Sequence, residues 1–479
     1  NYVTFNGGYN VSSTDLRSHG YSVLGFPADE LNDPGFGLDY HPEKKPTGNS
    51  ELSRMAGFFG NLNYTYDNRY FADFSVRADA SSRFGADKRW AVFWSAGVGY
   101  NLHNEVFLKK LEWVSLLRLR ASYGVTGGQN FNPYQAMTTY RFITDKWYGY
   151  GSGAEMLALG NDDLKWQSTV QKNFGLDLGM WKDRLTLTFN YYHKLSENSL
   201  TDVTLPPSLG FPSYKENLGE VVNEGWEFTL RGFVVKKEDF NIMLSVNGAQ
   251  NNNKLKKISN SLKAFNEEQD KQVENKVMAR YVEGQSLNTI WVVRSLGIDP
   301  ANGKELFLDK NGKRTYDWNA DDYVAEATTD PRLYGNLGLG IFYRGFSLNT
   351  YVNYSLGEKA YNQTLVDRVE NADKHYNCDR RVLYDRWHKP GDETFFKDVK
   401  DASVTRPTSR FVQKNNYLNM TSLNVAYEFN PRLLEPLRIK YLKLAFYMTD
   451  LFRISTMKAE RGLDYPFART FTTSLQIRF

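Results

Sequence analysis

The residues best suited to chemistry in this sequence are a serine flanked by glycines and two pairs of adjacent aspartates. Ser152 lies in GYGSGAE (149–155), which has the spacing of a nucleophilic serine, but its surroundings are polar and no strand leads from it into a helix. The adjacent carboxylates are Asp162 with Asp163 and Asp321 with Asp322, in polar segments typical of loops. Neighbouring carboxylates do not by themselves form an acid and base pair across a substrate. We therefore predict no catalytic residue and no enzymatic activity.

The segment LDKNGKRTYDWNADD (308–322) is the strongest candidate for metal binding. Its possible calcium ligands are Asp309, Asn311, Asp317, Asn319 and Asp321. The segment lacks the full twelve-position arrangement of an EF-hand, and Asn311-Gly312 is also a typical hairpin turn. We expect no metal or cofactor, with calcium in this loop as the open alternative.

The other metal-binding residue types are sparse. The six histidines are scattered without the i, i+4 spacing of a zinc helix. The single cysteine, Cys378, excludes an internal disulfide framework and a multi-cysteine metal site.

Aromatic side chains in loops are the candidates for ligand contact. The segment DKWYGYGSG (145–153) carries Trp147, Tyr148 and Tyr150, and Trp291 lies in a later loop. Flat rings with polar edges suit the faces of sugars, but they also suit the boundary between lipid and water. Substrate binding and packing at such a boundary therefore remain alternative interpretations of these four residues.

Composition narrows the class of protein. Aromatic residues make up 15% of the 479 residues, while the mean hydropathy is −0.56. The 59 Lys and Arg residues nearly balance the 55 Asp and Glu residues, without a long basic block. A nucleic-acid partner is therefore not expected. No run of about 18 apolar residues is present, so a membrane-spanning helix is excluded.

Alternation of apolar and polar residues is the dominant local pattern. In RLTLTFNYYHK (184–194), Leu185, Leu187 and Phe189 fall on one face and Thr186 and Thr188 on the other, which is the period of a strand. The alternation predicts strands at 2–9, 57–66, 70–79, 91–101, 116–125, 171–180, 184–194, 225–235, 240–250, 334–343, 346–356, 418–429, 438–450 and 471–479. The spacing of Leu255, Ile258 and Leu262 is in addition compatible with a helix.

Short and long connections alternate between these strands. Turns such as Asp67-Asn68-Arg69 and Arg344-Gly345 are tight, whereas segments such as 251–333 and 357–417 are long. In an up-and-down antiparallel sheet, this alternation places all short turns at one end and all long loops at the other, as in outer-membrane barrels with short periplasmic turns. Strands of about ten residues also match a tilted membrane crossing. We therefore predict an all-β protein, a transmembrane antiparallel β-barrel with long extracellular loops and short periplasmic turns.

The last strand keeps its alternation to the final residue of the sequence. Its apolar residues Phe471, Leu475, Ile477 and Phe479 share one face with Thr473. An unpaired strand edge is not stable in lipid, because its backbone groups find no water. We therefore expect these residues to belong to the strand that closes the barrel. A soluble β protein with one wet face is the alternative interpretation of the alternation.

Several segments together resemble the barrel of SusC/RagA-type TonB-dependent transporters. They are RADASSRFGADKRW (77–90), LRLRASYGVTGGQNFNPYQ (117–135), LKWQST (164–169), RLTLTFNYYHK (184–194), NLGEVVNEGWEF (217–228), RWHKPGD (386–392) and YPFARTFTTSLQIRF (465–479). Asp450 and Asn419 depart from the family pattern, where Asn and Arg are common. The resemblance implies a barrel of about 22 strands, of which residues 1–479 are the C-terminal portion with about fourteen strands. The plug domain and the early strands of the family have no counterpart in these residues.

The same resemblance implies a function and partners. It implies import of large nutrients, oligosaccharides above all and peptides as the alternative, across the outer membrane of a Gram-negative bacterium. The implied partners are a SusD-like lipoprotein, the TonB complex acting through the plug region, outer-membrane lipid and a second SusC–SusD pair in a dimer. A soluble carbohydrate-binding β protein and an outer-membrane barrel enzyme are the remaining alternatives.

Overall fold

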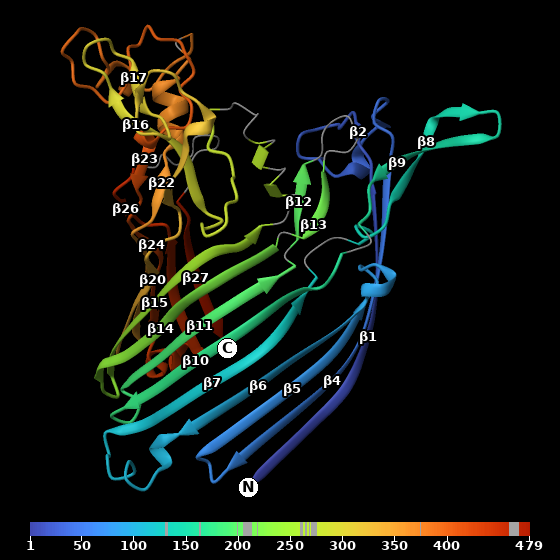
Figure 1. Ribbon diagram of the computed structural model, residues 1–479. Helices are drawn as coiled ribbons and strands as arrows, with labels where there is room; N and C mark the ends of the chain where they lie inside the picture. The colour runs from blue at the N-terminus through green and yellow to red at the C-terminus, as the bar shows by residue number, and fades with distance from the viewer. Residues whose placement is uncertain are drawn as a thin grey trace.

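Long antiparallel strands dominate this computed structural model (Figure 1). The structure describes residues 1–479 except 130–132, 162–163, 199, 205–212, 218, 259–261, 264–265, 268, 270–274, 374 and 459–468. Among the described residues, no helix is long and apolar enough to cross a membrane.

One large sheet contains fourteen strands in sequential order, and the short β26 (Arg453–Ser455) pairs with β24 as the fifteenth. The strands are β1 (Tyr2–Gly20), β4 (Thr47–Tyr66), β5 (Tyr70–Ser81), β6 (Trp90–Asn101), β7 (Val114–Gly128), β10 (Gln167–Met180), β11 (Leu185–Glu197), β14 (Gly219–Lys236), β15 (Phe240–Ile258), β20 (Leu333–Tyr343), β21 (Phe346–Leu356), β24 (Tyr417–Glu428), β25 (Tyr441–Thr449) and β27 (Phe471–Arg478). Each predicted strand overlaps one of these, so the all-β prediction and the number of strands are confirmed.

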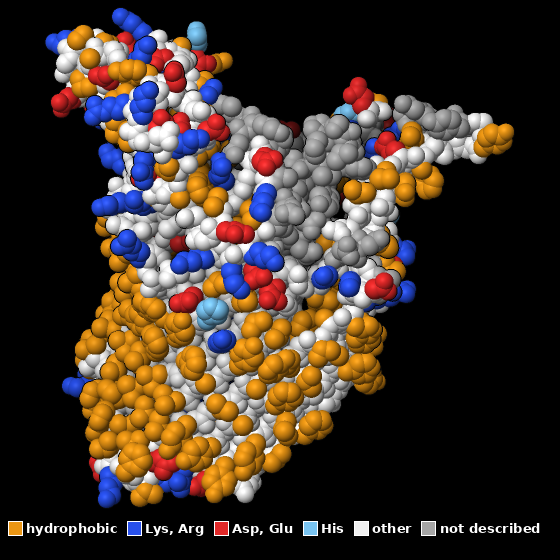
Figure 2. Space-filling view, viewed as in Figure 1, with side chains coloured by type: hydrophobic (Ala, Val, Ile, Leu, Met, Phe, Trp, Pro, Cys, Tyr) orange, Lys and Arg blue, Asp and Glu red, His pale blue; other side chains and the backbone are white. Residues whose placement is uncertain are grey.

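The register places apolar residues on one face of the sheet throughout. Phe5 of β1 lies opposite Leu62 of β4, and Leu62 lies opposite Phe74 of β5. The same face continues far along the sheet, where Leu187 of β11 lies opposite Leu230 of β14. Figure 1 shows the sheet curling so that its later strands lie behind the earlier ones. Figure 2 shows hydrophobic side chains covering the lower half of the outer face, with charged side chains above them and along the lower rim. This is the distribution of a lipid-facing belt.

The short turns have backbone conformations that bring antiparallel strands close together. Asp67 and Asn68 have φ angles of 50° and 51°, and Arg344 and Gly345 have 45° and 88°. Two consecutive residues with positive φ form the turn whose twist matches that of the flanking strands, and Asn and Gly adopt this conformation most easily. These turns lie at the lower end of the sheet in Figure 1, and the long connections lie at the upper end.

The long connections contain small sheets and short helices of their own. The small strands are β2 (Val23–Leu24), β3 (Asp39–Tyr40), β8 (Thr139–Tyr148), β9 (Gly151–Ala158), β12 (Leu200–Thr204), β13 (Ser213–Asn217), β16 (Thr289–Ile298), β17 (Glu305–Leu308), β18 (Arg314–Thr315), β19 (Tyr323–Thr328), β22 (Lys359–Tyr361) and β23 (Val412–Lys414). The helical turns are η1 (Pro34–Phe36), η2 (Ala86–Lys88), η3 (Leu102–Asn104), η5 (Ala320–Asp322), α2 (Gln363–Leu365), η6 (Val366–Glu370), η7 (Arg380–Leu383), η8 (Ser409–Phe411), α3 (Pro431–Leu434) and η9 (Glu435–Leu437). Of these, η3 lies in the β6–β7 connection, and α3 and η9 lie in the β24–β25 connection.

The interpretation of Leu255 and Ile258 as helical is wrong, because both lie in β15. Leu255 is fully buried against Val221 of the neighbouring β14 and against Leu262. The β14–β15 ribbon thus continues past the lipid belt into the loop region. There the alternation of apolar and polar residues weakens, which is why the sequence pattern did not extend the strand.

The two ends of the sheet order are β1 and β27. β27 pairs with β25 along its whole length, from Met448 opposite Phe471 to Tyr441 opposite Arg478. Among the described residues, β27 has no second partner strand, and β1 pairs only with β4. The barrel-closing role of Phe471, Leu475, Ile477 and Phe479 therefore stays a prediction.

Candidate functional site

Four neighbouring strands carry a connected row of polar side chains on the inner face of the sheet. Arg120 of β7 donates to both carboxylate oxygens of Asp177 in β10, at 2.9 and 3.1 Å. The same guanidinium donates to Asn190 of β11 at 3.1 Å, and Asn190 donates to Glu227 of β14 at 3.2 Å. Buried polar groups are stable only when they are hydrogen-bonded or hydrated. The row therefore gives the inner face of the sheet a polar surface that water can solvate. Such a face does not fit the apolar core of a soluble β protein.

A second polar group lies farther along the same inner face and depends on a glycine. Arg77 donates to Asp79 at 2.6 Å and to Asn10 at 3.4 Å, which joins β5 to β1 across β4. Gly57 of β4 lies beneath this contact, and a Cβ atom there would come within 2.1 Å of Asp79 Oδ1. The absence of a side chain at this position lets the carboxylate lie flat against the strand.

Neutral amides gather on the inner face toward the long-loop end. Asn251 and Asn253 of β15 donate to the Oδ1 of Asn223 in β14, at 3.2 and 2.9 Å. Asn251 also accepts a hydrogen bond of 3.0 Å from the Tyr192 hydroxyl. Each amide carries both donors and an acceptor. The cluster, which we call the amide cluster (Asn223, Asn251 and Asn253), can therefore bind neutral groups that both donate and accept.

A pocket of about 550 Å³ adjoins the amide cluster. Pairing between β15 and β20 stops at Ala249 and Tyr334, and residues 250–254 of β15 line the pocket. Beyond them, the Leu255 backbone is hydrogen-bonded to Gln285 and Gly284. Asp330 forms part of another wall and accepts hydrogen bonds from Ser286 at 2.5 Å and from Thr328 at 2.9 Å. Amide groups and a carboxylate around one pocket offer a polar chain many hydrogen-bonding partners.

Two long loops fold together above the sheet into a unit that we call the loop domain (289–330 and 359–414). Backbone and side-chain contacts join the two segments: Val293 donates through its N–H to Pro407 O at 3.2 Å, and Trp387 Nε1 donates to Pro300 O at 2.9 Å. The second segment has an apolar core of Val366, Val369, Val382, Phe396 and Phe411, each at most 6% exposed. In Figure 1 the loop domain lies at the upper left, around β16, β17, β22 and β23.

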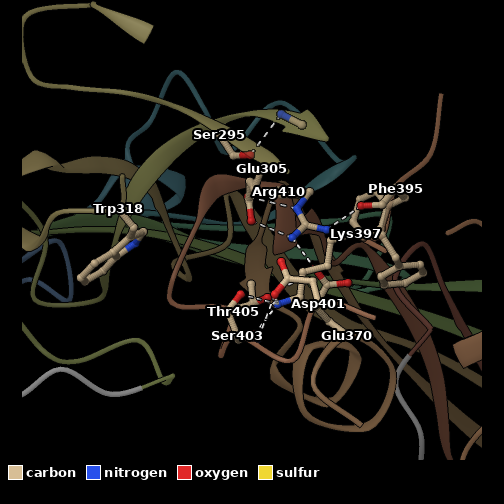
Figure 3. Close-up of polar contacts among 12 residues, drawn as sticks. Ser295, Glu305, Trp318, Glu370, Phe395, Lys397, Asp401, Ser403, Thr405 and Arg410 are labelled. Atoms are coloured by element: carbon tan, nitrogen blue, oxygen red, sulfur yellow. Dashed lines mark hydrogen bonds and ion pairs between the residues drawn. The ribbon is translucent and has the colours of Figure 1, made fainter. Parts of the chain in front are cut away.

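A buried ionic cluster connects the two segments of the loop domain (Figure 3). Arg410 lies between Glu305 of β17 and Glu370 of η6, with Nη2 at 2.7 and 2.6 Å from their carboxylates. The Arg410 side chain is 4% exposed, and the two carboxylate side chains are 8% and 0% exposed. The guanidinium also lies 4.5 Å from the centroid of the Phe411 ring. A single arginine therefore fixes one loop to the other.

Burial and the neighbouring carboxylates shift the pKa values of the cations in this cluster in opposite directions. Burial opposes the charged form of Arg410, but Glu305 and Glu370 outweigh burial and raise the pKa of Arg410. The nearby carboxylates offset burial less at Lys397, so burial lowers the pKa of its ammonium. Lys397 donates to Ser403 and lies 3.7 Å from Asp401. Hydrogen-bonded ion pairs of Arg410 with Glu305 and Glu370 hold the two loop segments together.

The predicted aromatic contacts do not form one site. Trp147 and Tyr148 lie at the end of β8, where Trp147 pairs with Ser152 of β9, and Tyr150 is fully exposed at the tip of this hairpin. Trp291 lies in β16 of the loop domain and is only 8% exposed. The structure thus separates the hairpin residues from Trp291, and their role in substrate binding stays a prediction.

The candidate calcium residues are engaged with their own turns. The Asp309 carboxylate accepts hydrogen bonds from the N–H groups of Asn311 and Lys313, at 2.9 and 2.8 Å. The Asn319 side chain accepts a hydrogen bond from Asp321 N at 3.0 Å. Within the described ranges, no group of three or more His, Cys, Asp or Glu side chains is placed to hold a metal. The interpretation of Asn311-Gly312 as a turn agrees with the φ of 78° at Gly312.

The two aspartate pairs also have different outcomes. Asp162 and Asp163 lie outside the described residues. Asp322 is 8% exposed and accepts a hydrogen bond of 2.9 Å from Lys310 N, which is a structural role.

The sequence analysis did not single out the amide cluster or Arg410. The inward positions of the alternation indicate the amides, whereas no local pattern indicates the contact between Arg410 and Glu305.

Known proteins share both the sequence pattern and the fold. The family described as TonB dependent receptor-like, beta-barrel, matches residues 1–371. TonB-dependent receptor SusC of Bacteroides thetaiotaomicron is 28% identical over 474 residues, with 91% of this chain and 45% of that protein covered. TonB-dependent receptor P39 of Formosa agariphila is 24% identical over 503 residues, with 91% and 47% covered. The chain thus spans about half the length of the curated relatives that it matches.

Solved structures agree on the fold. The structure of the RagAB peptide transporter aligns with 99% of this chain and 53% of its own chain, at a TM-score of 0.84 and 24% identity. The RagAB peptide importer in its open-open state aligns with a TM-score of 0.81. The family match over residues 1–371 does not support the soluble β protein or the enzyme, and the predicted outer-membrane location and absence of enzymatic activity agree with that family.

An apolar outer belt, a polar inner wall and a family match over residues 1–371 lead to one assignment. The chain belongs to the TonB-dependent receptor-like β-barrel family and resembles its SusC/RagA-type members.

Proposed function

We propose that this chain forms the C-terminal part of the barrel of a TonB-dependent importer for large polar nutrients, with oligosaccharides as the cargo. The observation that carries the proposal is the connected polar wall on the inner face, from Arg120 through Asp177 and Asn190 to Glu227. A wall of this kind favours a water-filled passage through a belt that is apolar outside. Membership in the TonB-dependent receptor family supports the same function.

The amide cluster supports a cargo rich in hydroxyl groups. Sugar hydroxyls both donate and accept hydrogen bonds, as do the side chains of Asn223, Asn251 and Asn253. The cluster is uncharged, and the adjoining pocket of about 550 Å³ is large enough for a sugar unit. Peptide backbones offer the same two kinds of group, so a peptide cargo is the competing outcome of the test.

Partners complete the proposed mechanism. The long loops gather at one end of the sheet, where they offer a broad folded surface to a SusD-like lipoprotein, and two such pairs form a dimer. TonB acts through a plug region, which lies outside the fourteen strands described. The part of the chain in hand supplies the wall and the loops, and no chemical step is required of it.

Binding measurements on the complete transporter with its lipoprotein test the cargo. We expect isothermal titration with a panel of defined oligosaccharides to detect binding that Asn223→Ala combined with Asn251→Ala weakens roughly thirtyfold, because two lost hydrogen bonds cost about 2 kcal/mol together. Asn349→Ala is the matched control, since Asn349 is an inner-face amide of β21 remote from the pocket. Binding of peptides alone, with the same sensitivity to the double variant, would replace the oligosaccharide assignment.

A further inference from the structure

Four neighbouring strands of the main sheet carry an asparagine at the same level. Asn247 of β15 lies opposite Asn336 of β20, and Asn336 lies opposite Asn353 of β21. Asn353 in turn lies opposite Asn419 of β24. We call these four residues the asparagine row (Asn247, Asn336, Asn353 and Asn419).

The register places the asparagine row on the inner face of the sheet. Asn247 lies opposite Thr229 of β14, and Thr229 lies opposite Thr188 of β11. Thr188 lies opposite Asp177, whose carboxylate belongs to the polar wall that begins at Arg120. The asparagine row therefore continues the hydroxyl and carboxylate groups of the earlier strands as a line of amides.

The rows of inner-face residues directly above and below the asparagine row are uncharged. The row above, toward the long loops, consists of Ala249, Tyr334, Ser355 and Tyr417. The row below consists of Ser245, Gly338, Tyr351 and Ser422. A neutral polar ligand fits this part of the wall better than a charged one, which would lose hydration without gaining a counter-charge.

The amides of the asparagine row have hydrogen-bonding capacity left for a ligand. Asn247 Oδ1 accepts hydrogen bonds from Asn336 N at 2.9 Å and from Asn336 Nδ2 at 3.3 Å. Asn419 Nδ2 donates to Asp450 at 3.4 Å. The half-buried Asn353 makes no side-chain hydrogen bond with another described residue. Because each amide carries two donor hydrogens and an acceptor oxygen, the row keeps free donors and acceptors, above all at Asn353.

Two exposed tyrosine rings flank the asparagine row on opposite sides. Tyr334, above Asn336 in β20, is 40% exposed, and Tyr351, below Asn353 in β21, is 48% exposed. Gly338 lies opposite Tyr351, and a Cβ atom at this glycine would come within 3.0 Å of Tyr351 Cε1. The glycine thus leaves room for the tyrosine ring against the wall. Flat rings with polar edges, set among amides, suit the faces of sugars.

The spacing of the asparagine row suits an extended chain of sugar units. Neighbouring strands lie about 4.8 Å apart, so the row spans about 14 Å from Asn247 to Asn419. This strand spacing is close to the length of one sugar unit in an extended chain, so successive units can repeat the same contact on successive strands. Strands of such barrels tilt by roughly 35–45°. The row therefore runs obliquely and leads along the passage as well as around it.

We propose that the asparagine row binds an extended, uncharged oligosaccharide of at least four units, with one unit on each strand. The inference rests on the proposed import of oligosaccharides and defines their class more closely. Asn247 and Asn251 lie on the same face of β15, about 14 Å apart along the strand. The row thus extends the surface of the amide cluster from the pocket into the passage. Sugar hydroxyls bond to the amides, and the apolar faces of the sugars lie on Tyr334 and Tyr351.

Isothermal titration of the complete transporter with its lipoprotein tests the inference, with malto-, laminari- and xylo-oligosaccharides from disaccharide to hexasaccharide. We expect Asn336→Ala combined with Asn353→Ala to weaken hexasaccharide binding roughly thirtyfold, because two hydrogen bonds are lost. Disaccharide binding should stay unchanged, since a disaccharide is short enough to occupy only the pocket beside the amide cluster. Asn349→Ala is the matched control, because Asn349 lies on the same face of β21 but below the row, opposite Gly340.

The charge of the ligand is tested by competition. A hexasaccharide of galacturonic acid should not displace the neutral hexasaccharide, because no cation lies in the asparagine row or in the rows beside it. Displacement would overturn the uncharged class of ligand.

The dependence on chain length separates this inference from the proposed function. Heat-modifiable migration on gels confirms that each variant is folded. Equal effects of the double variant on disaccharide and hexasaccharide, including no effect on either, would overturn the asparagine row as a site and leave oligosaccharide import intact. Binding of peptides alone, or of none of the three series, would overturn both proposals together.

Discussion

Arg410 holds Glu305, which lies 105 positions earlier in the chain, through hydrogen bonds of 3.1 and 2.7 Å. The same guanidinium holds Glu370 at 2.6 Å. One guanidinium therefore pairs with two buried carboxylates from different loop segments. Removal of one partner from a buried ion pair is costly, because the remaining charge stays buried without compensation.

Arg410→Met is the direct test of this contact. We expect the loop domain to lose about 3–5 kcal/mol of stability, since Glu305 and Glu370 remain buried. Hydrogen exchange should detect loss of protection in β17 and η6, while the strands of the main sheet stay protected. Arg294→Met is the matched control, because Arg294 pairs with Glu326 at 3.3 Å with its side chain 57% exposed. An exposed pair of this kind contributes at most about 1 kcal/mol.

Removal of Arg410 together with both of its carboxylate partners should reverse part of the loss. An apolar replacement of a complete buried ion cluster is often neutral or stabilising. We expect Glu305→Leu and Glu370→Leu, added to Arg410→Met, to restore protection of β17 relative to Arg410→Met alone. Equal protection of β17 in the single and triple variants would contradict the prediction that the uncompensated buried carboxylates cause the loss.

Acid should loosen the second segment of the loop domain at η7. Hydrogen bonds from the Arg381 side chain and backbone lower the pKa of Asp379 to about 2, below its usual value of 3.8. A lowered pKa in the folded state contributes stability above pH 4, and this stability is lost as the pH falls from 4 through 2. The Asp379 side chain is 32% exposed, so solvent screening keeps the effect small.

Limited proteolysis between pH 4 and pH 2 with an acid-active protease measures this effect. Cleavage near 379–383 should rise as the pH falls. In Asp379→Asn it should be higher at pH 4 and change less with pH. A cleavage rate in the wild type that does not depend on pH across this range would contradict the prediction.

Gly57 provides a test of the inner wall. We expect Gly57→Ala to destabilise the barrel by about 1–3 kcal/mol, because the new Cβ would collide with Asp79 and displace it from Arg77. Gly60→Ala in the same strand is the control, since its nearest neighbour would be Val76 Cγ1 at 3.8 Å. Urea unfolding followed by heat-modifiable migration measures both variants. Equal free energies of unfolding for Gly57→Ala and Gly60→Ala would contradict the predicted collision between a Cβ atom at Gly57 and Asp79.

The sequence predicts the main sheet well because the cause of its pattern is local. Each strand crosses between lipid and water, so every second residue must be apolar, as at Leu185, Leu187 and Phe189. Alternation no longer predicts a strand beyond the lipid belt, because the strand there does not separate lipid from water. Leu255 lies beyond the belt and is buried by Val221 and Leu262, so its burial no longer follows from strand alternation.

The alternation of apolar and polar residues does not predict the contacts within the loop domain. Arg410 is an ordinary polar residue by its local sequence, and only the fold brings Glu305 and Glu370 to it. Trp291 illustrates the converse. Its type indicates an exposed ligand contact, but β16 places it in the interior of the loop domain. Tertiary packing of the loops decides both outcomes.

Substitution of adjacent residues in β11 tests which face meets lipid. Phe189 lies on the apolar outer face opposite Phe228, whereas Thr188 lies on the inner face opposite Asp177. We expect Phe189→Lys to destabilise the folded barrel in lipid vesicles by about 2–4 kcal/mol, because an ammonium near the middle of the bilayer loses its hydration. Thr188→Lys should cost less than about 1 kcal/mol, since it enters a hydrated lumen beside a carboxylate. Urea titration in vesicles measures both variants, and a larger cost at Thr188 would mean that the two faces are assigned the wrong way round.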